Sequence, residues 1–350
     1  MHFAIDVREA CHQSRTGKGQ WTYGFITALL KRSLPVTLFS DSPLPPAWIL
    51  PHVSHVLFPP GILWHVRVAR LMRQTMEHSL YISPTSFIVP FLLRSRVRTV
   101  VVIHDLIALR SDPHQLRATV IERLLLRTVL RNAYRICTVS RSTAHDLLQR
   151  FPQTDASRIH SIFAGFRERN NATKRNPESF ILSVGTLCPR KNQLSLIRAY
   201  ASLPGEVRLR HALVLAGGRG WKDAPIIRAA RRTTGVLWKG YVTDDEYDRL
   251  LSTCLFFAHP SHDEGFGMQV LDALTMGVPV LTSERGSLRE VAGEAALYTD
   301  PDDVHAIAQG LEILLRDADL RTRLSEEGPR RAAGFSWDRT VDLFLAAVHP

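Results

Sequence analysis

Short apolar runs alternate with longer stretches of helical periodicity along most of the chain. A run such as Thr99–Ile103, apolar at nearly every position, indicates a buried strand. Strands that alternate with helices are typical of parallel α/β layers. In the first half we predict strands at Phe3–Val7, Val36–Phe39, Leu80–Ile82, Thr99–Ile103 and Arg135–Val139, and helices at Gly19–Lys31, Leu63–Met76, Leu116–Arg131 and Ser142–Gln149.

The same alternation of apolar runs and helical segments begins again after a polar stretch. This stretch begins at Phe166 and contains Asn170, Asn171 and Pro177. With 350 residues and 45% hydrophobic content, the chain is long enough for two packed cores. We therefore predict a first domain at 1–166, a linker at 167–179 and a second domain at 180–350, whose last helix can pack back onto the first domain. In the second half we predict strands at Phe180–Val184, His211–Ala216, Val236–Lys239, Leu255–Ala258 and Val278–Thr282, and helices at Gln193–Ser202, Val304–Leu315 and Trp337–Val348.

The positive charge is concentrated in the first half. The net charge is +11, with 20 Lys and Arg against 9 Asp and Glu in residues 1–166, and 24 of each kind in residues 167–350. The first half is therefore expected to meet an anionic partner. Arginines recur every three residues on one predicted helix, and three more follow an apolar stretch. These six are Arg67, Arg70, Arg73, Arg94, Arg96 and Arg98.

Apolar residues accompany these arginines, which favours a membrane surface that carries anionic lipids. They include Leu63, Trp64, Leu71, Met76, Phe87, Ile88, Val89, Phe91 and Leu92. Two alternatives stay open. A nucleic-acid partner is disfavoured because no recognisable nucleic-acid-binding module is present. A simply solvated basic face is the other reading of the same pattern.

The remaining composition points to the cytoplasm. The N-terminus lacks the basic and long apolar regions of a secretory signal. No apolar run approaches the roughly 20 residues of a membrane span. Cys11, Cys137, Cys188 and Cys254 are scattered without the spacing of a metal site, as expected of reduced thiols. We expect a cytoplasmic protein that associates peripherally with the inner face of the membrane.

The densest pattern of candidate chemistry begins at Glu264, which follows the predicted strand Leu255–Ala258. Gly265, Phe266 and Gly267 then lead into a helix, and Asp272 stands eight residues after Glu264. The free N–H groups at such a helix start are a natural phosphate site. Carboxylates beside a phosphate are better suited to accept hydroxyl protons from groups attached to it. A sugar on one side and a ribose on the other meet that need, so the pattern predicts a nucleotide-sugar site.

Further candidates stand where other predicted strands end. Arg190 and Lys191 lie between a strand and a helix, where a planar guanidinium and a compact ammonium can bridge a diphosphate. His104 ends a buried strand and is followed by an aspartate, which can orient the imidazole ring. Ser140 either lines the ligand site or caps the helix that follows it.

A short glycine-containing segment follows the first predicted strand. Gly17 and Gly19 can let backbone N–H groups approach an anion there, although a plain turn is the alternative. Arg219 follows two glycines at the end of another strand and is a candidate for the nucleotide pocket.

Several of these segments resemble the signature motifs of glycosyltransferase family 4. The resemblance spans nearly the whole chain and is densest between Phe180 and Pro301. It rests on Gly185 followed by Arg190-Lys191-Asn192, on Glu264, and on Gly277-Val278-Pro279-Val280. The family pattern has a second Glu where this chain has Asp272, so the grip on the partner hydroxyls is expected to differ.

The resemblance implies the GT-B fold class, two Rossmann-like doubly wound α/β domains that face each other across a cleft. It also implies a retaining transferase that moves a sugar from a nucleotide-diphosphate sugar, with GDP-mannose favoured, to a glycan or lipid-linked acceptor. His104 and Glu264 then become the candidate catalytic residues at the sugar. The donor-binding candidates are Gly17, Gly19, Ser140, Arg190, Lys191, Gly265, Phe266, Gly267 and Asp272.

We expect no metal and no other cofactor, because Arg190, Lys191 and the helix N-terminus can neutralise the departing diphosphate. Two alternatives stay open. One is an epimerase or phosphorylase-like enzyme of the same fold. The other is a non-catalytic scaffold that binds nucleotide sugars, which the Asp272 departure favours and the other matches oppose.

Overall fold

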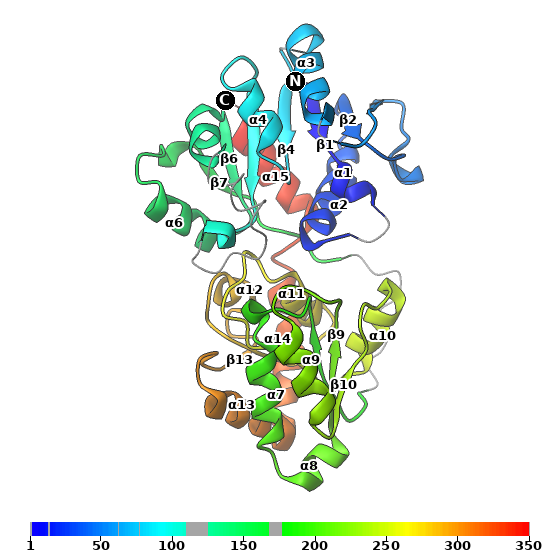
Figure 1. Ribbon diagram of the computed structural model, residues 1–350, viewed down its shortest axis with the longest axis vertical. Helices are drawn as coiled ribbons and strands as arrows, with labels where there is room; N and C mark the ends of the chain where they lie inside the picture. The colour runs from blue at the N-terminus through cyan, green and yellow to red at the C-terminus, as the bar shows by residue number, and fades with distance from the viewer. Residues whose placement is uncertain are drawn as a thin grey trace. The chain divides into compact units, whose positions relative to one another are not determined.

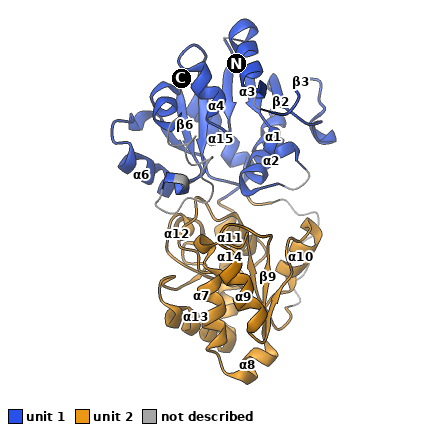
Figure 2. Cartoon of the chain, viewed as in Figure 1, with its two compact units in different colours: residues 1–165, 335–350 blue, residues 166–334 orange. Residues whose placement is uncertain are grey.

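The chain folds into two compact units (Figure 1; Figure 2). The computed structural model describes residues 2–12, 15–61, 63–76, 78–109, 125–167 and 177–349. Unit 1 contains residues 1–165 together with 335–350, and unit 2 contains residues 166–334. The last helix thus belongs to unit 1 rather than to the C-terminal domain. Within the predicted linker, residues 168–176 lie outside the described residues.

Unit 1 is built on a parallel seven-stranded sheet in the order β3-β2-β1-β4-β5-β6-β7. The central strands are buried along their length, which explains why they read as continuous apolar runs in the sequence. The chain order reverses between the neighbouring strands β1 and β4. The strands are β1 (Phe3–Asp6), β2 (Val36–Ser40), β3 (Val53–Leu57), β4 (Leu80–Ser83), β5 (Thr99–Ile103), β6 (Arg135–Thr138) and β7 (Ile159–Ser161).

Helices connect these strands. Residues 125–132 are helical, while the start of the predicted helix Leu116–Arg131 lies outside the described residues. The other described helices of unit 1 are α1 (Arg8–Cys11), α2 (Gly17–Leu30), α3 (Leu63–Thr75), α4 (Ile88–Leu93), α6 (Arg141–Arg150) and α15 (Trp337–Val348), with short 3-10 turns at Pro46–Trp48, Ile107–Leu109 and Ala156–Arg158.

The C-terminal helix α15 packs into the core of unit 1 through aromatic contacts. The Phe344 ring lies 5.1 Å from Phe25 and 6.0 Å from Phe3, centroid to centroid. A Cβ atom on Gly24 would come within 2.2 Å of the Trp337 ring, so only glycine permits this close approach. Arg135 also donates to the backbone of α15, at 2.8 Å from the Ala347 carbonyl.

Unit 2 repeats the plan with a parallel six-stranded sheet in the order β10-β9-β8-β11-β12-β13. Its chain order reverses between β8 and β11, which are paired neighbours. The strands are β8 (Phe180–Val184), β9 (Ala212–Ala216), β10 (Val236–Trp238), β11 (Phe256–His259), β12 (Val280–Thr282) and β13 (Leu297–Tyr298).

Helices cover the sheet of unit 2 and complete its core, in which Tyr200, Phe256 and Leu311 are fully buried. The helices are α7 (Gln193–Ala201), α8 (Gly205–Arg210), α9 (Ala224–Arg232), α10 (Asp244–Thr253), α11 (Met268–Thr275), α12 (Leu288–Ala292), α13 (Val304–Arg316) and α14 (Ala318–Ala332), with a 3-10 turn at Pro189–Lys191.

The predicted α/β class with two Rossmann-like, doubly wound units is confirmed by these two all-parallel sheets. Within the described ranges, no helix combines the length and the apolar character that crossing a lipid bilayer requires. In doubly wound sheets, ligands bind beyond the carboxyl ends of the strands where the chain order reverses. In unit 2 this rule predicts a ligand site at the loops that follow β8 and β11.

Candidate active site

The loops after β8 and β11 carry the residues that the sequence singled out most strongly. Arg190 and Lys191 form a 3-10 turn after β8, and Glu264 lies in the loop between β11 and α11. Because β8 and β11 are neighbouring parallel strands, both loops leave the same edge of the sheet. This topology brings together two segments that lie more than 70 residues apart in the chain.

Backbone and side-chain hydrogen bonds join the two loops. The Ser261 hydroxyl donates to the Arg190 carbonyl at 3.0 Å, and the His262 N–H donates to the same oxygen at 2.9 Å. Asn192, in the left-handed conformation with φ of 59°, donates through its side chain to the carbonyls of Pro260 and Pro301. The position of the two cations is therefore set by the fold.

Four side chains converge on one point. The Glu264 carboxylate, 7% exposed, accepts from Arg190 Nη1 at 2.7 Å, and Lys191 Nζ lies 2.6 Å from its Oε1. His259 Nε2 donates to Oε1 at 2.9 Å. The predicted diphosphate cations and the predicted sugar-binding carboxylate thus form one buried cluster. A carboxylate has about four acceptor positions, so three donors leave room for one more hydroxyl.

The electrostatics of the cluster favour an ionised Glu264. Burial alone would raise the pKa of Glu264, but the charges of Arg190 and Lys191 and the bond from His259 hold it well below its usual range. Burial and the Lys191 charge lower the pKa of His259. His259 is therefore neutral near pH 7 and holds its proton on Nε2, facing Glu264.

The backbone around Glu264 is supported from the following loop. The Ser287 hydroxyl donates to the Glu264 carbonyl at 3.0 Å, and the Ser287 N–H lies 3.1 Å from it. Gly286 has φ of 58°, and a Cβ atom there would lie 2.6 Å from the Glu264 carbonyl oxygen. A side chain at Gly286 would displace the Glu264 loop.

The predicted helix start after Glu264 is present, but its residues differ in accessibility. Gly267 precedes α11 with φ of 91° and has no side chain to satisfy the first N–H groups of the helix. Gly265 is partly exposed, whereas Phe266 is 5% exposed and packs inward. Gly265 is therefore the more accessible of the two glycines, because Gly267 is buried like Phe266.

Asp272 lies on α11, one turn beyond its start, and is 8% exposed. Its Oδ2 accepts a hydrogen bond of 3.0 Å from the Tyr247 hydroxyl on the neighbouring helix α10. Sequence reasoning did not identify Tyr247, because nothing in the pattern of α10 distinguishes it from a packing residue.

Unit 1 carries the remaining candidates. His104 follows β5, and its Nε2 donates to the Pro84 carbonyl at 2.8 Å. Burial of the ring and the nearby charge of Lys18 lower the pKa of His104 to about 4. The ring is therefore neutral at pH 7. Its Nδ1 is the nitrogen that can accept a hydrogen bond from a hydroxyl.

The glycine segment of unit 1 forms the first turn of α2 rather than a loop. Thr16 caps this helix by accepting from the Gly19 N–H at 3.2 Å. A Cβ atom on Gly19 would lie 2.6 Å from the Glu9 carbonyl, so this glycine is required for packing against α1. A Cβ on Gly17 would meet nothing within 4 Å, so Gly17 is open to a ligand.

Of the two roles predicted for Ser140, the structure shows the helix cap. It is fully buried and accepts from the Thr143 N–H at 3.0 Å as the N-cap of α6. Its hydroxyl also donates to Thr143 Oγ1. These contacts support the capping role of Ser140, and its donor-binding role stays a prediction.

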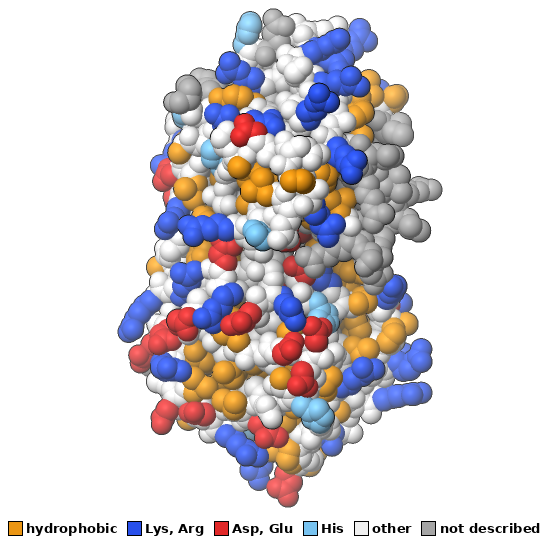
Figure 3. Space-filling view, turned by 90° about the vertical axis from the view of Figure 1, so that its left-hand side faces the viewer, with side chains coloured by type: hydrophobic (Ala, Val, Ile, Leu, Met, Phe, Trp, Pro, Cys, Tyr) orange, Lys and Arg blue, Asp and Glu red, His pale blue; other side chains and the backbone are white. Residues whose placement is uncertain are grey.

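The six arginines predicted for a membrane surface are all exposed, but most of their apolar neighbours are not. Trp64 is 1% exposed and donates to the Ser40 carbonyl, and Met76 packs against the core. On the face that Figure 3 shows, Lys and Arg side chains predominate over unit 1, whereas both signs mix over unit 2. Leu63 and Val66 remain as exposed apolar residues on α3, at 58% and 51%.

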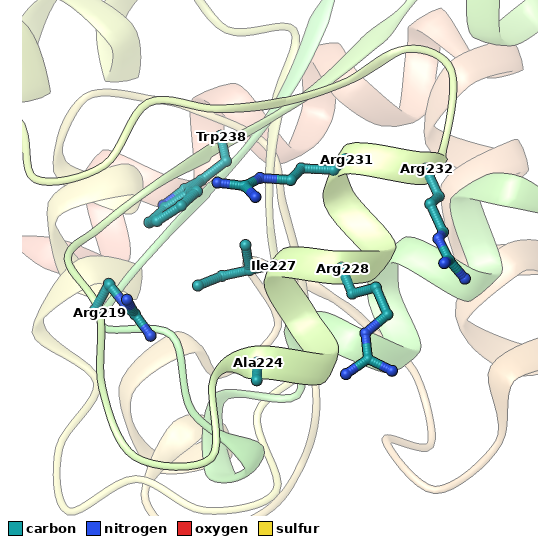
Figure 4. Close-up of a pocket in the computed structure, with 7 residues that line it drawn as sticks. All are labelled: Arg219, Ala224, Ile227, Arg228, Arg231, Arg232 and Trp238. Atoms are coloured by element: carbon teal, nitrogen blue, oxygen red, sulfur yellow. The ribbon is translucent and has the colours of Figure 1, made fainter.

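A surface pocket of about 620 Å³ lies on unit 2 between α9 and β10, away from the Glu264 cluster (Figure 4). Arg219, a candidate for the nucleotide pocket, lines it instead and pairs with Asp223 at 2.9 Å. Figure 4 shows Arg231 extending toward Trp238, while Arg228 and Arg232 extend away from it. These cations do not converge on one point, in contrast to Arg190 and Lys191.

Several residues of the cluster were not predicted from the sequence. His259 directly follows the predicted strand Leu255–Ala258. Gly286 and Ser287 follow the predicted strand Val278–Thr282, in a segment for which no role was predicted. Their roles depend on contacts between segments that are distant in sequence. Within the described residues, no group of three or more His, Cys, Asp or Glu side chains is placed to hold a metal ion.

Two protein-family models match consecutive parts of the chain. Residues 166–331 match the family model described as glycosyl transferases group 1, and residues 16–167 match the model described as glycosyltransferase family 4. The O-antigen chain mannosyltransferase B of Escherichia coli is 40% identical over 173 residues, which are 49% of this chain and 45% of that protein. The serotype-specific mannosyltransferase WbdA of Escherichia coli is 30% identical over 272 residues, 71% of this chain and 33% of that protein. The chain thus spans less than half the length of these curated relatives.

Solved structures share the fold at low identity. Anabaena HepE, in a crystal structure with UDP and glucose, superposes with a TM-score of 0.74 and 16% identity over 99% of this chain and 98% of that one. WaaG, a glycosyltransferase involved in lipopolysaccharide biosynthesis, gives a TM-score of 0.73 and 16% identity over the same shares. With consecutive family models that together extend from residue 16 to residue 331, the chain belongs to the group 1 and family 4 glycosyltransferases.

Proposed function

We propose that the protein is a retaining glycosyltransferase that moves mannose from GDP-mannose to a glycan or lipid-linked acceptor during synthesis of a cell-surface polysaccharide. The observation that carries this proposal is the convergence of Arg190, Lys191 and Glu264 where the chain order of the unit 2 sheet reverses. The donor and the pathway are suggested by the similarity to O-antigen mannosyltransferases.

The residues of the cluster suit a nucleotide-diphosphate sugar. Arg190 and Lys191 supply two fixed positive charges, and the N-terminus of α11 adds free N–H groups. As the bond to the sugar breaks, these groups stabilise the negative charge that develops on the leaving diphosphate. They do so without a metal ion, so we expect transfer to need none.

Glu264 has a second task in this proposal. While it holds the two cations in place, its remaining acceptor position accepts a hydrogen bond from a hydroxyl of the donor sugar. His104 of unit 1 is proposed, on its own surroundings, to accept a hydrogen bond from a substrate hydroxyl through Nδ1, since its Nε2 donates to the Pro84 carbonyl. With a pKa of about 4 it acts as a neutral acceptor and not as an acid at pH 7.

The exposed arginines of unit 1 are proposed to hold the enzyme on the inner face of the membrane, where lipid-linked acceptors are found. Their exposure on α3 and after α4 supports this assignment. The anionic headgroups would attract the basic side chains, and the attraction would weaken at high salt.

The test is release of nucleoside diphosphate from GDP-mannose with and without an acceptor fraction from polysaccharide-producing cells. Acceptor-dependent release, with the anomeric configuration of the product unchanged in its NMR spectrum, is expected. Binding without acceptor-dependent release would instead support the scaffold that Asp272 favours. Activity is expected to persist in excess EDTA, and its loss with rescue by magnesium or manganese would contradict the metal-independent mechanism.

A further inference from the structure

The hydrogen bond between Tyr247 and Asp272 ties together two helices of unit 2 at the side of the predicted nucleotide site. The Tyr247 hydroxyl, on α10, donates to Asp272 Oδ2 on α11 over 3.0 Å. Asp272 is 8% exposed and Tyr247 is partly buried. A carboxylate with so little access to water requires protein donors, and the tyrosine provides one.

The start of α10 holds Tyr247 in place. Thr243 caps the helix by accepting from the Glu246 N–H at 3.3 Å. Glu246 pairs with Lys239 at 3.1 Å and with Arg249 at 2.8 Å, which joins the end of β10 to the first turns of α10. Arg167 pairs with Asp244 at 3.1 Å. These contacts fix the residue next to Tyr247 and so restrict where its hydroxyl can lie.

The short side chain of Asp272 makes the position of its carboxylate depend on this contact. The family pattern has Glu at this position, and aspartate is one methylene shorter, so its carboxylate stands closer to the α11 backbone. A hydrogen bond from a side chain on another helix selects one orientation of that short carboxylate. The same bond fixes the position of Oδ2 within the carboxylate group.

We propose that Tyr247 is a positioning residue that orients the Asp272 carboxylate toward the ribose hydroxyls of the nucleotide donor. The inference rests on the proposed function, because it assumes a nucleoside diphosphate in unit 2. A purely structural bond between α10 and α11 is the competing interpretation. The two differ in one measurable respect, since only a positioning role makes the bond affect recognition of the ribose.

The experiment is calorimetric binding of GDP and UDP, each compared with its 2′-deoxy and 3′-deoxy form, to wild type and to Tyr247→Phe. Wild type is expected to prefer at least one ribonucleotide over its deoxy forms. Y247F is expected to weaken that ribonucleotide about tenfold and the matching deoxy form far less, since the lost bond is one to a charged group. In an Asp272→Ala background, Y247F should change nothing further.

Tyr200→Phe is the matched control. Its hydroxyl lies 2.9 Å from the His211 carbonyl, just before β9, and 3.0 Å from the Arg208 carbonyl in α8. Y200F should lower thermal stability and leave ribose discrimination unchanged. If Y247F behaves like Y200F, the inference is wrong while the proposed function stands. If wild type binds neither GDP nor UDP, the proposed function fails and the inference falls with it.

Discussion

Lys191 Nζ and Glu264 Oε1 lie 2.6 Å apart, and both side chains are at most 8% exposed. Removing one member of a buried ion pair leaves the other charge without compensation, which costs far more than an exposed pair contributes. Arg190 and His259 approach the same carboxylate, so one negative charge supports three donors. The cluster is stable only while a negative charge occupies its centre.

Glu264→Gln is therefore expected to lower the free energy of unfolding by about 3–5 kcal/mol, because it leaves Lys191 buried without its counter-charge. Binding of GDP should be retained, since a diphosphate can supply the missing negative charge. The rise in melting temperature on adding GDP should be larger in E264Q than in wild type. Transfer should be largely lost. Thermal unfolding with and without GDP, together with a turnover assay, measures all three effects.

Glu294→Gln provides the control. Glu294 pairs with Arg289 at the same distance of 2.6 Å, but it is 85% exposed. E294Q should therefore change stability by less than about 1 kcal/mol. An E264Q variant that melts like wild type would show that the Glu264 cluster is not held by its charge.

Arg190→Ala together with Lys191→Ala should weaken binding of GDP much more than binding of guanosine, because the two cations are proposed to contact the phosphates and not the nucleoside. Calorimetry with both ligands measures the difference. Arg228→Ala with Arg231→Ala removes two positive charges from exposed positions of the same unit and should leave both affinities unchanged. An equal loss for GDP and guanosine in the first variant would contradict the diphosphate role.

The sequence was sufficient to predict most of the strands. Parallel strands such as Thr99–Ile103 are buried on both faces, and their apolar runs stand out. The edge strand β3 (Val53–Leu57) was missed because three of its five residues are exposed. The helix α14 was missed because charged residues dominate it. In each case the local pattern lacked the apolar content on which such predictions depend.

The contacts between the side chains of the site could not be predicted from the sequence. Arg190 and Glu264 were both identified, but as groups that bind different parts of a ligand. Their direct pairing follows from the adjacency of β8 and β11, which are far apart in the chain. His259 and Tyr247 act through contacts of the same kind. These contacts depend on which strands and helices are neighbours in the folded chain. The local pattern of a single sequence does not show which elements are neighbours.

The neutral state of His104 predicts a pH dependence of stability. The pKa of His104 is lowered from 6.5 to about 4, so below pH 6.5 the unfolded chain binds a proton that the folded protein does not. The free energy of unfolding should therefore decrease as the pH falls from about 6.5 to about 4, by about 3 kcal/mol in total. Denaturant unfolding across this range, in wild type and His104→Gln, measures the contribution.

In H104Q the decrease over this window should be smaller than in wild type. His145→Gln removes an exposed histidine from α6 and should leave the wild-type decrease intact. Identical pH profiles for wild type and H104Q would show that His104 is not held neutral by its surroundings.

The membrane assignment of unit 1 is tested by charge reversal on α3. Changing Arg67, Arg70 and Arg73 together to Glu should strongly reduce flotation with anionic vesicles, because each basic residue near such a surface contributes about 1 kcal/mol. Wild-type binding should also fall at high salt, since the field decays within a Debye length of roughly 10 Å at 0.1 M. Transfer to a soluble acceptor analogue should persist, because these three arginines are not among the residues proposed to bind the donor or to act on the sugar.

The α9 arginines give a matched control for this experiment. Arg228, Arg231 and Arg232 are also exposed on one helix, but they belong to unit 2, whose half of the sequence carries no net charge. Their reversal to Glu changes the total charge by the same amount as the α3 variant. If vesicle binding depends on the α3 surface, only the α3 variant loses it. Equal losses would indicate a response to total charge alone, and wild type that floats no better with anionic than with neutral lipid would refute the membrane assignment.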